Sequence, residues 1–249
     1  MNHIRPRVVA TIEARMTSSR LPGKALLPAL GKPMLAHLVE RLKAVPSVDA
    51  IVIATTINQA DQPIVDFAHN AMINCFRGSE NNVMARVLGA AESAAADVIV
   101  EITGDCPIID PDIVEQTIRM FLHHSVDYMS NAVIRSYPDG MDAQVFSLDA
   151  LRNASQRTDN PLDLEHVSRY IYQHPNEYRI GHLVAPPSLH WPELGLTLDE
   201  DDDYRLLKKI IETLGQSDPL FGCHKVISLL RSHPEWVAIN SQVKRKGDA

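Results

Sequence analysis

The sequence predicts an α/β protein built around a mostly parallel central sheet. Three apolar runs with strand character recur at residues 8–14, 50–55 and 98–103. Helical patterns separate them, and strand–helix–strand units of this length give parallel strands joined by right-handed crossovers. At 249 residues, of which 45% are hydrophobic and 22% charged, the chain suits one large domain and is not a mostly disordered protein.

Helices are expected between and after these strands. Pro33 stands where a first helical turn begins, and apolar residues follow it at helical spacing. A second helix is expected over residues 61–72, and Ser79 is a candidate N-cap for a third. Pro111 is a candidate opening residue of a fourth helix that runs through Phe121. In such a sheet, ligands bind beyond the carboxyl ends of the strands.

The alternation of strand and helix patterns is interrupted after Asp127. We expect residues 127–194 to form an excursion from the sheet within a single domain of residues 1–249. Its expected parts are a turn at 136–140, a strand at 141–146, one helix face at 164–171, a strand at 178–184 and a break at Pro186–Pro187. A short strand at 196–199 is then expected to lead into a helix that reaches Leu214, followed by a last helix at 222–232 and a frayed tail at 244–249.

Charge and cysteine content exclude several classes of function. The 24 basic and 31 acidic residues give a net charge of −7, which argues against a general nucleic-acid binder. The cysteines Cys75, Cys106 and Cys223 have no paired spacing, so a zinc site or a disulfide framework is not expected. The first apolar run stops at Glu13, too short for a signal peptide, and no run approaches the roughly 20 apolar residues of a membrane helix. We therefore expect a cytoplasmic protein with no membrane partner.

The loop after the first strand, residues 15–24, concentrates positive charge at the carboxyl end of a strand. It reads RMTSSRLPGK and carries Arg15, Arg20 and Lys24 together with three hydroxyl groups. Arginine and lysine side chains bind phosphate oxygens, and hydroxyl groups add neutral donors, so a triphosphate is the expected ligand. A solvated loop that binds nothing is the alternative. The spacing of glycines excludes a Walker A loop, and the chain has no GxGxxG motif.

Four segments in order resemble the signature of the cytidylyltransferase superfamily, which includes CMP-Kdo and CMP-sialic acid synthetases. They are ARMTSSRLPGK at 14–24, FRGSENNV at 76–83 with Arg86, TGDCP at 103–107 with Asp110, and PDG at 138–140 with LTLD at 196–199. The segments are most similar to the spore coat polysaccharide biosynthesis protein F branch, and the likeness runs from about residue 8 to residue 214. It implies a three-layer Rossmann-like nucleotidyltransferase fold, related to the GT-A fold.

The resemblance implies transfer of CMP from CTP to a nonulosonic or other keto-sugar acid, with release of pyrophosphate, in surface polysaccharide synthesis. Arg15, Lys24 and Asp105 would be catalytic, and Asp105 and Asp199 would hold Mg²⁺, which prefers oxygen ligands. The nucleotide-binding residues implied are Ala14, Arg15, Ser18, Arg20, Lys24, Thr55, Thr56, Arg77, Ser79, Asn82 and Asp105. The excursion would bind the acceptor through Asp139, Asp142, Gln144 and Glu165, and would join two copies into a homodimer.

Several of these residues have a structural alternative. Ser79 and Asn82 are typical of turns and caps, and Asp105 is typical of an Asx turn. Asp199 begins the acidic run 199–203, in which we assign the helix cap to Asp201 or Asp202 and the metal to Asp199. Glu101 lies within an otherwise apolar strand, and its partner is not evident from the sequence.

Other functions remain open from the sequence. A glycosyltransferase would use an Asp-x-Asp pair for its metal, and such pairs occur at Asp110/Asp112 and Asp201/Asp203. A sugar-phosphate nucleotidylyltransferase would use another nucleoside triphosphate, and a nucleotide-binding regulator would show no turnover. The basic loop favours nucleotidyl transfer, because it suits a triphosphate whose pyrophosphate departs.

Overall fold

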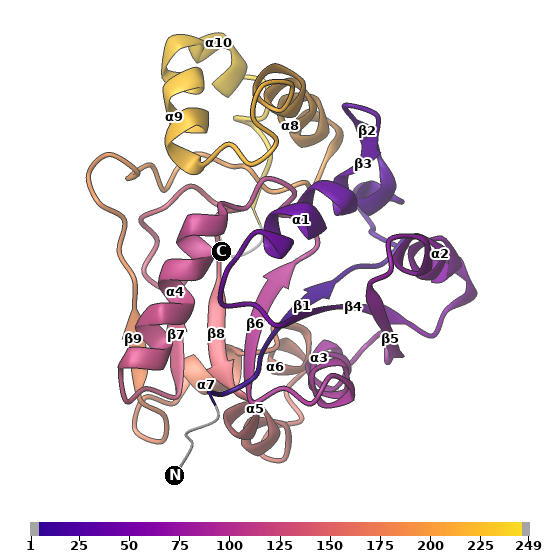
Figure 1. Ribbon diagram of the computed structural model, residues 1–249, viewed down its shortest axis with the longest axis vertical. Helices are drawn as coiled ribbons and strands as arrows, with labels where there is room; N and C mark the ends of the chain where they lie inside the picture. The colour runs from indigo at the N-terminus through magenta and orange to yellow at the C-terminus, as the bar shows by residue number, and fades with distance from the viewer. Residues whose placement is uncertain (1–4, 246–249) are drawn as a thin grey trace.

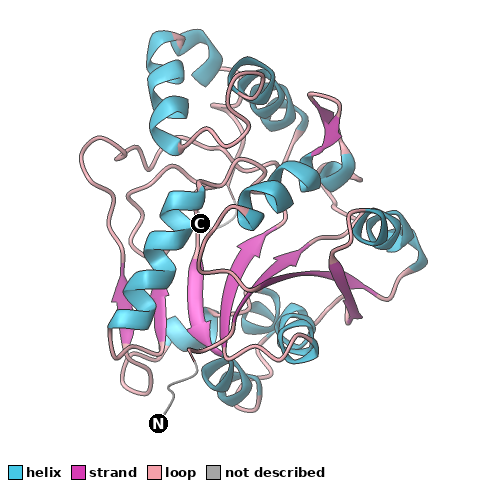
Figure 2. Cartoon of the chain, viewed as in Figure 1, coloured by secondary structure: helices cyan, strands magenta, loops and turns pink. Residues whose placement is uncertain are grey.

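A seven-stranded sheet runs through the computed structural model, which describes residues 5–245 (Figures 1 and 2). The strand order is β5-β4-β1-β6-β8-β7-β9, and β8 runs antiparallel to both neighbours while the other pairs are parallel. The strands are β1 Val8–Glu13, β4 Ala50–Thr56, β5 Asn74–Gly78, β6 Val98–Thr103, β7 Tyr128–Ser130, β8 Gln144–Ser147 and β9 Ile180–His182. The expected α/β architecture with a mostly parallel sheet is confirmed.

Helices cover both faces of this sheet. The first face packs against α1 Met34–Lys43, α2 Gln62–Asn70 and α4 Pro111–His123, and the second against α3 Val83–Ser93, α5 Leu148–Ser155 and α7 Arg169–Gln173. Because side chains alternate along a strand, Ala10 of β1 enters the first core and Val9 enters the second. The apolar runs that predicted β1, β4 and β6 are buried on both faces, as expected for central parallel strands.

A third apolar cluster lies beyond the carboxyl edge of the sheet. It joins α8 Asp201–Leu214 and α9 Cys223–Ser232 with the loops around them, and α10 Pro234–Val237 follows (Figure 1). The short hairpin of β2 Pro28–Ala29 and β3 Lys32–Pro33 packs against α8. This layer lies beyond the carboxyl ends of the central strands (Figure 1).

Residues 127–194 contribute strands to the sheet, whereas the sequence suggested an excursion from it. β7, β8 and β9 all come from this segment and continue the sheet beyond β6. The helix face expected at 164–171 is broken into α6 Pro161–Glu165 and α7, because His166 has non-helical dihedral angles. In α6 the apolar Leu162 is 51% exposed and Asp163 is the buried residue, so the apolar pattern does not continue from α6 into α7.

Two helix caps differ from the sequence expectation. Asn82 caps α3 by accepting a hydrogen bond from the backbone N–H of Ala85, while the Ser79 hydroxyl accepts one from Asn82 in the preceding turn. The N-cap of α8 is Glu200, and neither Asp201 nor Asp202 holds that position. The Asp203 carboxylate instead reaches back to accept the Glu200 backbone N–H at 2.9 Å.

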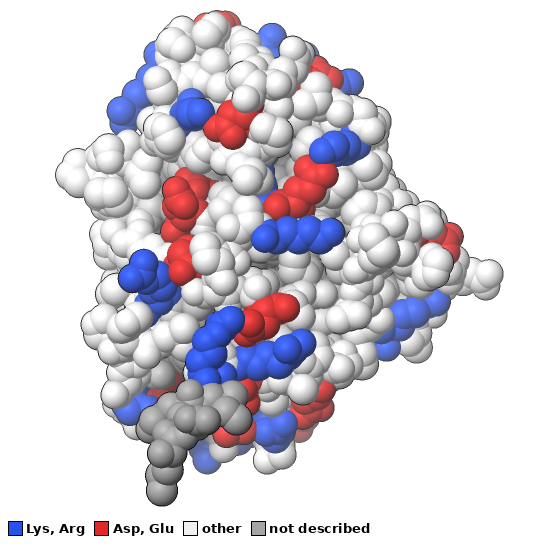
Figure 3. Space-filling view, in the orientation of Figure 1, with Lys and Arg blue, Asp and Glu red and all other residues white. Residues whose placement is uncertain are grey.

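The surface is mixed in charge. On the face drawn in Figure 3, basic and acidic side chains are interspersed, and no continuous basic stripe appears there. Within residues 5–245, no helix combines the length and the apolar character that crossing a bilayer requires.

A buried carboxyl in β6 gives a testable consequence for stability. Burial raises the pKa of Glu101 from 4.5 to about 8. Between these pH values the unfolded chain releases the proton and the folded chain keeps it, so this group lowers stability as the pH rises through that range. We expect Glu101→Gln to reduce the loss of stability between pH 5 and pH 8, measured by urea unfolding. Glu193→Gln, at an exposed site, is the control, and an unchanged pH slope in Glu101→Gln would contradict the expectation.

Candidate active site

The basic loop is held in a defined shape at the carboxyl end of β1. Gly23 adopts a left-handed backbone with φ of 72°, which glycine tolerates without strain, and its N–H donates to the Met16 carbonyl at 2.8 Å. The Met16 N–H in turn donates to the buried carboxylate of Asp61 at 2.6 Å. Lys24 then begins a short 3₁₀ helix, η1 Lys24–Leu26, and so projects from a fixed position.

Lys24 lies between the two carboxylates predicted to hold a metal. Its Nζ is 3.0 Å from an oxygen of Asp105 and 3.0 Å from an oxygen of Asp199. Arg20 approaches Asp199 from another side at 2.8 Å. Asp105 follows β6, the sheet neighbour of β1, and its carbonyl accepts the N–H of Leu198, which fixes the segment that carries Asp199. The structure therefore brings cations and carboxylates from three distant segments to one place.

The electrostatics favour the ionised forms of this cluster. Burial alone would lower the pKa of Lys24, but Asp105 and Asp199 outweigh it, so the pKa is raised. Burial would raise the pKa of Asp105, but Lys24 and hydrogen bonds hold it below its ordinary value. Lys24 thus stays cationic and Asp105 anionic at neutral pH.

The PDG segment lies against the segment that ends in Asp199. The Leu196 N–H donates to the Asp139 carbonyl at 2.7 Å, and the Asp139 N–H donates to the Leu194 carbonyl at 2.9 Å. Gly140 has φ of 99°, and a side chain there would meet the Leu196 backbone at 2.7 Å, so only glycine fits. The strand expected at 196–199 is absent from the described structure; a single bridge between Asp139 and Gly195 takes its place.

Acidic side chains predominate around the PDG segment. Burial, reinforced by the nearby Asp139, raises the pKa of Asp142 to about 7. Arg135 lies 3.1 Å from Asp139 and 3.9 Å from Asp142. The predicted acceptor residues Asp139 and Asp142 are thus neighbours of each other.

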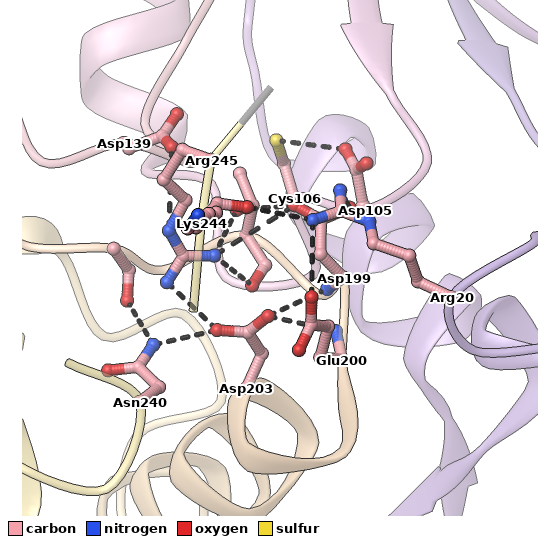
Figure 4. Close-up of polar contacts among 12 residues, drawn as sticks. Arg20, Asp105, Cys106, Asp139, Asp199, Glu200, Asp203, Asn240, Lys244 and Arg245 are labelled. Atoms are coloured by element: carbon pink, nitrogen blue, oxygen red, sulfur yellow. Dashed lines mark hydrogen bonds and ion pairs between the residues drawn. The ribbon is translucent and has the colours of Figure 1, made fainter. Parts of the chain in front are cut away.

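Arg245 enters the same region, although the sequence indicated a frayed tail at 244–249. Its guanidinium lies 2.8 Å from the fully buried Asp203 and donates to the Thr197 hydroxyl at 2.8 Å (Figure 4). The Lys244 carbonyl accepts a hydrogen bond from Arg20 at 2.9 Å. Residues 244 and 245 therefore pack on the site, while 246–249 lie outside the described residues. No local sequence pattern marks an arginine whose partners lie more than 40 residues away.

Three of the predicted nucleotide-binding residues, Thr55, Thr56 and Arg77, lie at the carboxyl ends of β4 and β5. Arg77 donates to the carbonyls of Thr56 and Asn58, at 2.9 and 2.8 Å, and Thr56 bonds to the Asp61 carboxylate. Asp61 was missed by the sequence analysis, yet it connects this loop with the basic loop through Met16. Thr55 is fully buried, and its register places it on the sheet face opposite Thr56.

The remaining predicted residues fall into three places. Ala14 is buried at the end of β1, Ser18 is half-buried in the basic loop, and Arg15 lies 3.4 Å from Glu80. Gln144 lies on β8 beside Glu101, where its side-chain oxygen accepts hydrogen bonds from Tyr128 and Ser168. Glu165 lies at the last position of α6.

The sheet is mostly parallel, and its carboxyl edge carries a basic loop suited to phosphate beside two carboxylates. This combination is typical of nucleotidyltransferases. Comparison with known proteins makes the class specific. The family described as Cytidylyltransferase matches residues 9–219, and this chain belongs to that family.

Full-length relatives support the assignment. The chain is 33% identical over 243 residues to an uncharacterized protein of Methanocaldococcus jannaschii, covering 96% of this chain and 97% of that protein. It is 31% identical over 234 residues to the spore coat polysaccharide biosynthesis protein SpsF of Bacillus subtilis, covering 92% and 95%. A solved cytidylyltransferase from Leptospira borgpetersenii superposes with a TM-score of 0.88 at 29% identity, covering 93% and 97%.

Two relatives whose names give a substrate match about half of this chain. A 3-deoxy-manno-octulosonate cytidylyltransferase of Pelobacter propionicus is 36% identical over 46% of this chain and 44% of its own. An 8-amino-3,8-dideoxy-manno-octulosonate cytidylyltransferase of Shewanella frigidimarina is 32% identical over 49% and 50%. The structure of a CMP:2-keto-3-deoxy-manno-octonic acid synthetase complexed with CTP shares the fold, with a TM-score of 0.61 at 20% identity over 83% of this chain and 99% of that one.

The ion pair of Arg245 predicts an effect on stability. Arg245→Ala removes the cation that pairs with Oδ1 of the fully buried Asp203. The other side-chain partner of Oδ1 is Asn240, at 2.8 Å. We expect a loss of about 1–3 kcal/mol in the free energy of unfolding, because a buried carboxylate loses a charged partner. Urea unfolding measures it, with the exposed Arg205→Ala as a matched arginine control. Equal stability of the two variants would show that the contact contributes little.

Proposed function

We propose that this protein transfers CMP from CTP to a keto-sugar acid and releases pyrophosphate, in the synthesis of a surface polysaccharide. The observation that carries the proposal is the position of Lys24 between Asp105 and Asp199. A cation that reaches two carboxylates at 3.0 Å can equally reach phosphate oxygens held beside them. The homodimer joined through residues 127–194 stays a prediction.

The basic loop would act on the polyphosphate. Arg15, Arg20 and Lys24 would hold the β- and γ-phosphates and stabilise the charge that develops on pyrophosphate as its bond to the α-phosphorus breaks. In this structure Arg20 and Lys24 pair with Asp199. We expect both side chains to turn toward the phosphates when the nucleotide binds. The acceptor hydroxyl would attack from the opposite side, so that positioning supplies much of the acceleration.

Asp105 and Asp199 fit a magnesium ion. Both present oxygen atoms toward one point, the Lys24 ammonium, and Mg²⁺ prefers a small number of carboxylates completed by phosphate oxygens and water. Within residues 5–245, no group of three or more acidic, histidine or cysteine side chains forms a closed metal cage. When bound, Mg²⁺ would supply neutralisation of the negative charge between the α-phosphate and the attacking oxygen.

The acceptor side is built from residues 139–144. We propose that Asp139 and Asp142 contact hydroxyl groups of the sugar, because they lie beside the Asp199 segment through the hydrogen bonds of Leu196. Gln144 and Glu165 would contact the sugar from the second face of the sheet.

The structure gives structural roles to the residues that a glycosyltransferase would use. Asp110 caps α4 by accepting the Asp112 N–H at 2.9 Å and also accepts the Cys223 N–H at 2.6 Å. Asp203 is occupied by the cap of α8 and by Arg245. Neither Asp-x-Asp pair is therefore disposed to hold a metal, which favours nucleotidyl transfer over glycosyl transfer.

Pyrophosphate release tests the reaction directly. Each of CTP, ATP, GTP and UTP is incubated with a panel of keto-sugar acids and sugar phosphates, with Mg²⁺ or with excess EDTA. We expect release with CTP and a keto-sugar acid, and its loss in EDTA. Consumption of a nucleotide sugar without use of CTP would support the glycosyltransferase instead, and nucleotide binding with no turnover for any acceptor would support a regulator.

Substitutions test the site. Lys24→Ala and Asp105→Asn should each lower kcat by on the order of a hundredfold, because each removes charge stabilisation at the reacting phosphates. Lys208→Ala, on the exposed side of α8, is the control and should retain activity. Near-normal pyrophosphate release by either site variant would show that the cluster is not the catalytic centre.

A further inference from the structure

Two carboxyl groups, Glu13 and Glu101, lie buried on the same face of adjacent central strands. In the parallel register of β1 and β6, Thr11 is opposite Glu101 and Glu13 is opposite Thr103. Because alternate residues share a face, Thr11, Glu13, Glu101 and Thr103 all belong to the face that packs against α3 and α5. A patch of polar groups thus interrupts an otherwise apolar layer.

Four polar side-chain atoms of this patch have no hydrogen-bond partner among the described residues. Both carboxyl oxygens of Glu13, one of Glu101 and the Thr11 hydroxyl are buried without a hydrogen-bond partner. Thr11 is 0% exposed and Glu101 is 4% exposed. Buried polar groups in folded proteins are nearly always satisfied, so three unsatisfied side chains side by side indicate that something else binds them.

The fold favours the neutral form of both carboxyl groups, so a cation bound beside them would be needed to ionise them. Burial, together with the mutual repulsion of the two carboxyls, raises the pKa of Glu13, and burial raises that of Glu101. Arg86 is the cation that opposes the effect at Glu13, but its guanidinium donates to the backbone carbonyls of Ala54, Ser79 and Glu80. A cationic group is therefore the ligand that this patch would bind best.

The patch adjoins the proposed site of reaction. Asp105 is close enough to Glu13 to raise its pKa, and the Gly104 N–H donates to the Glu13 carbonyl at 2.9 Å. Glu101 is opposite Gln144 on β8, which belongs to the proposed acceptor side. Thr103, at the end of the same row, is exposed and marks the side from which a ligand would enter.

We propose that Glu13 and Glu101 bind a protonated amino group of the acceptor, so that the acceptor of this protein is an amino sugar acid. This inference rests on the proposed nucleotidyl transfer and specifies its substrate. Each carboxylate would accept an N–H of the ammonium group, and the Thr11 hydroxyl would offer a third acceptor.

The test compares acceptors that differ only in the substituent at one carbon. 3-Deoxy-manno-octulosonate, 8-amino-3,8-dideoxy-manno-octulosonate and the N-acetylated form of the latter make one such set, with further sets carrying the substituent at other carbons. Pyrophosphate release with CTP gives kcat/KM, and isothermal titration calorimetry of each sugar gives affinity without turnover. Wild type is compared with Glu13→Gln, Glu101→Gln and the exposed control Glu193→Gln.

We expect at least one set in which wild type prefers the free amine by about tenfold or more over the hydroxyl form and over the N-acetyl form. The reason is that only the free amine places a positive charge at that carbon. Glu101→Gln and Glu13→Gln should remove that preference, and Glu193→Gln should keep it. The proposal is overturned if no set shows the preference in binding, or if the preference survives in both site variants. Amine-selective binding without pyrophosphate release would support the amine site and overturn the proposed reaction, so the two failures are distinguishable.

Discussion

The contact of Lys24 with both Asp105 and Asp199 is the constraint on which the site depends. It joins a loop after β1, a turn after β6 and the segment before α8. β1 and β6 are neighbours in the sheet, so the first two groups meet because parallel strands end at the same edge. The third group is brought there by α8, whose apolar face packs into the cluster beyond that edge. A cation between two carboxylates satisfies all three charges where burial would otherwise oppose them.

Further polar contacts hold the walls around this contact. Asp61 accepts a hydrogen bond from Met16 and one from Thr56, so it joins the basic loop to the end of β4. Asp203 accepts the N–H groups of Asp199 and Glu200 and pairs with Arg245. The carboxylates of Asp61 and Asp203 are 0% exposed, and both oxygens of each have partners. They differ in this respect from Glu13, whose buried oxygens have no partner among the described residues. The contrast separates groups that stabilise the fold from groups left for a ligand.

The two sides of the proposed site have opposite chemistry. The side of residues 15–24 gathers cations suited to phosphate, while the side toward β8 carries Asp139, Asp142 and Glu101. Cations suit the phosphates of a nucleoside triphosphate, and carboxylates can accept hydrogen bonds from the hydroxyl groups of a sugar acid. A further positive group on the sugar would suit the acidic side. Membership of the cytidylyltransferase family agrees with this division and leaves the acceptor to be identified by its chemistry.

The sequence by itself determined the central strands, most helices and the motifs whose order marks the family. β6 was expected at 98–103 and lies there, because a run of apolar residues between polar turns is a local signal. The sequence also indicated Lys24, Asp105 and Asp199 as site residues. It did not indicate that the ammonium group of Lys24 would contact both carboxylates. Only the tertiary structure decided the antiparallel insertion of β8, the cap at Glu200, the break between α6 and α7 and the docking of Arg245. The insertion of β8 and the docking of Arg245 depend on partners far away in the chain, and local patterns carry no information about such pairs. The cap at Glu200 uses Asp203, three residues on, but the acidic run 199–203 offers several candidates for that position.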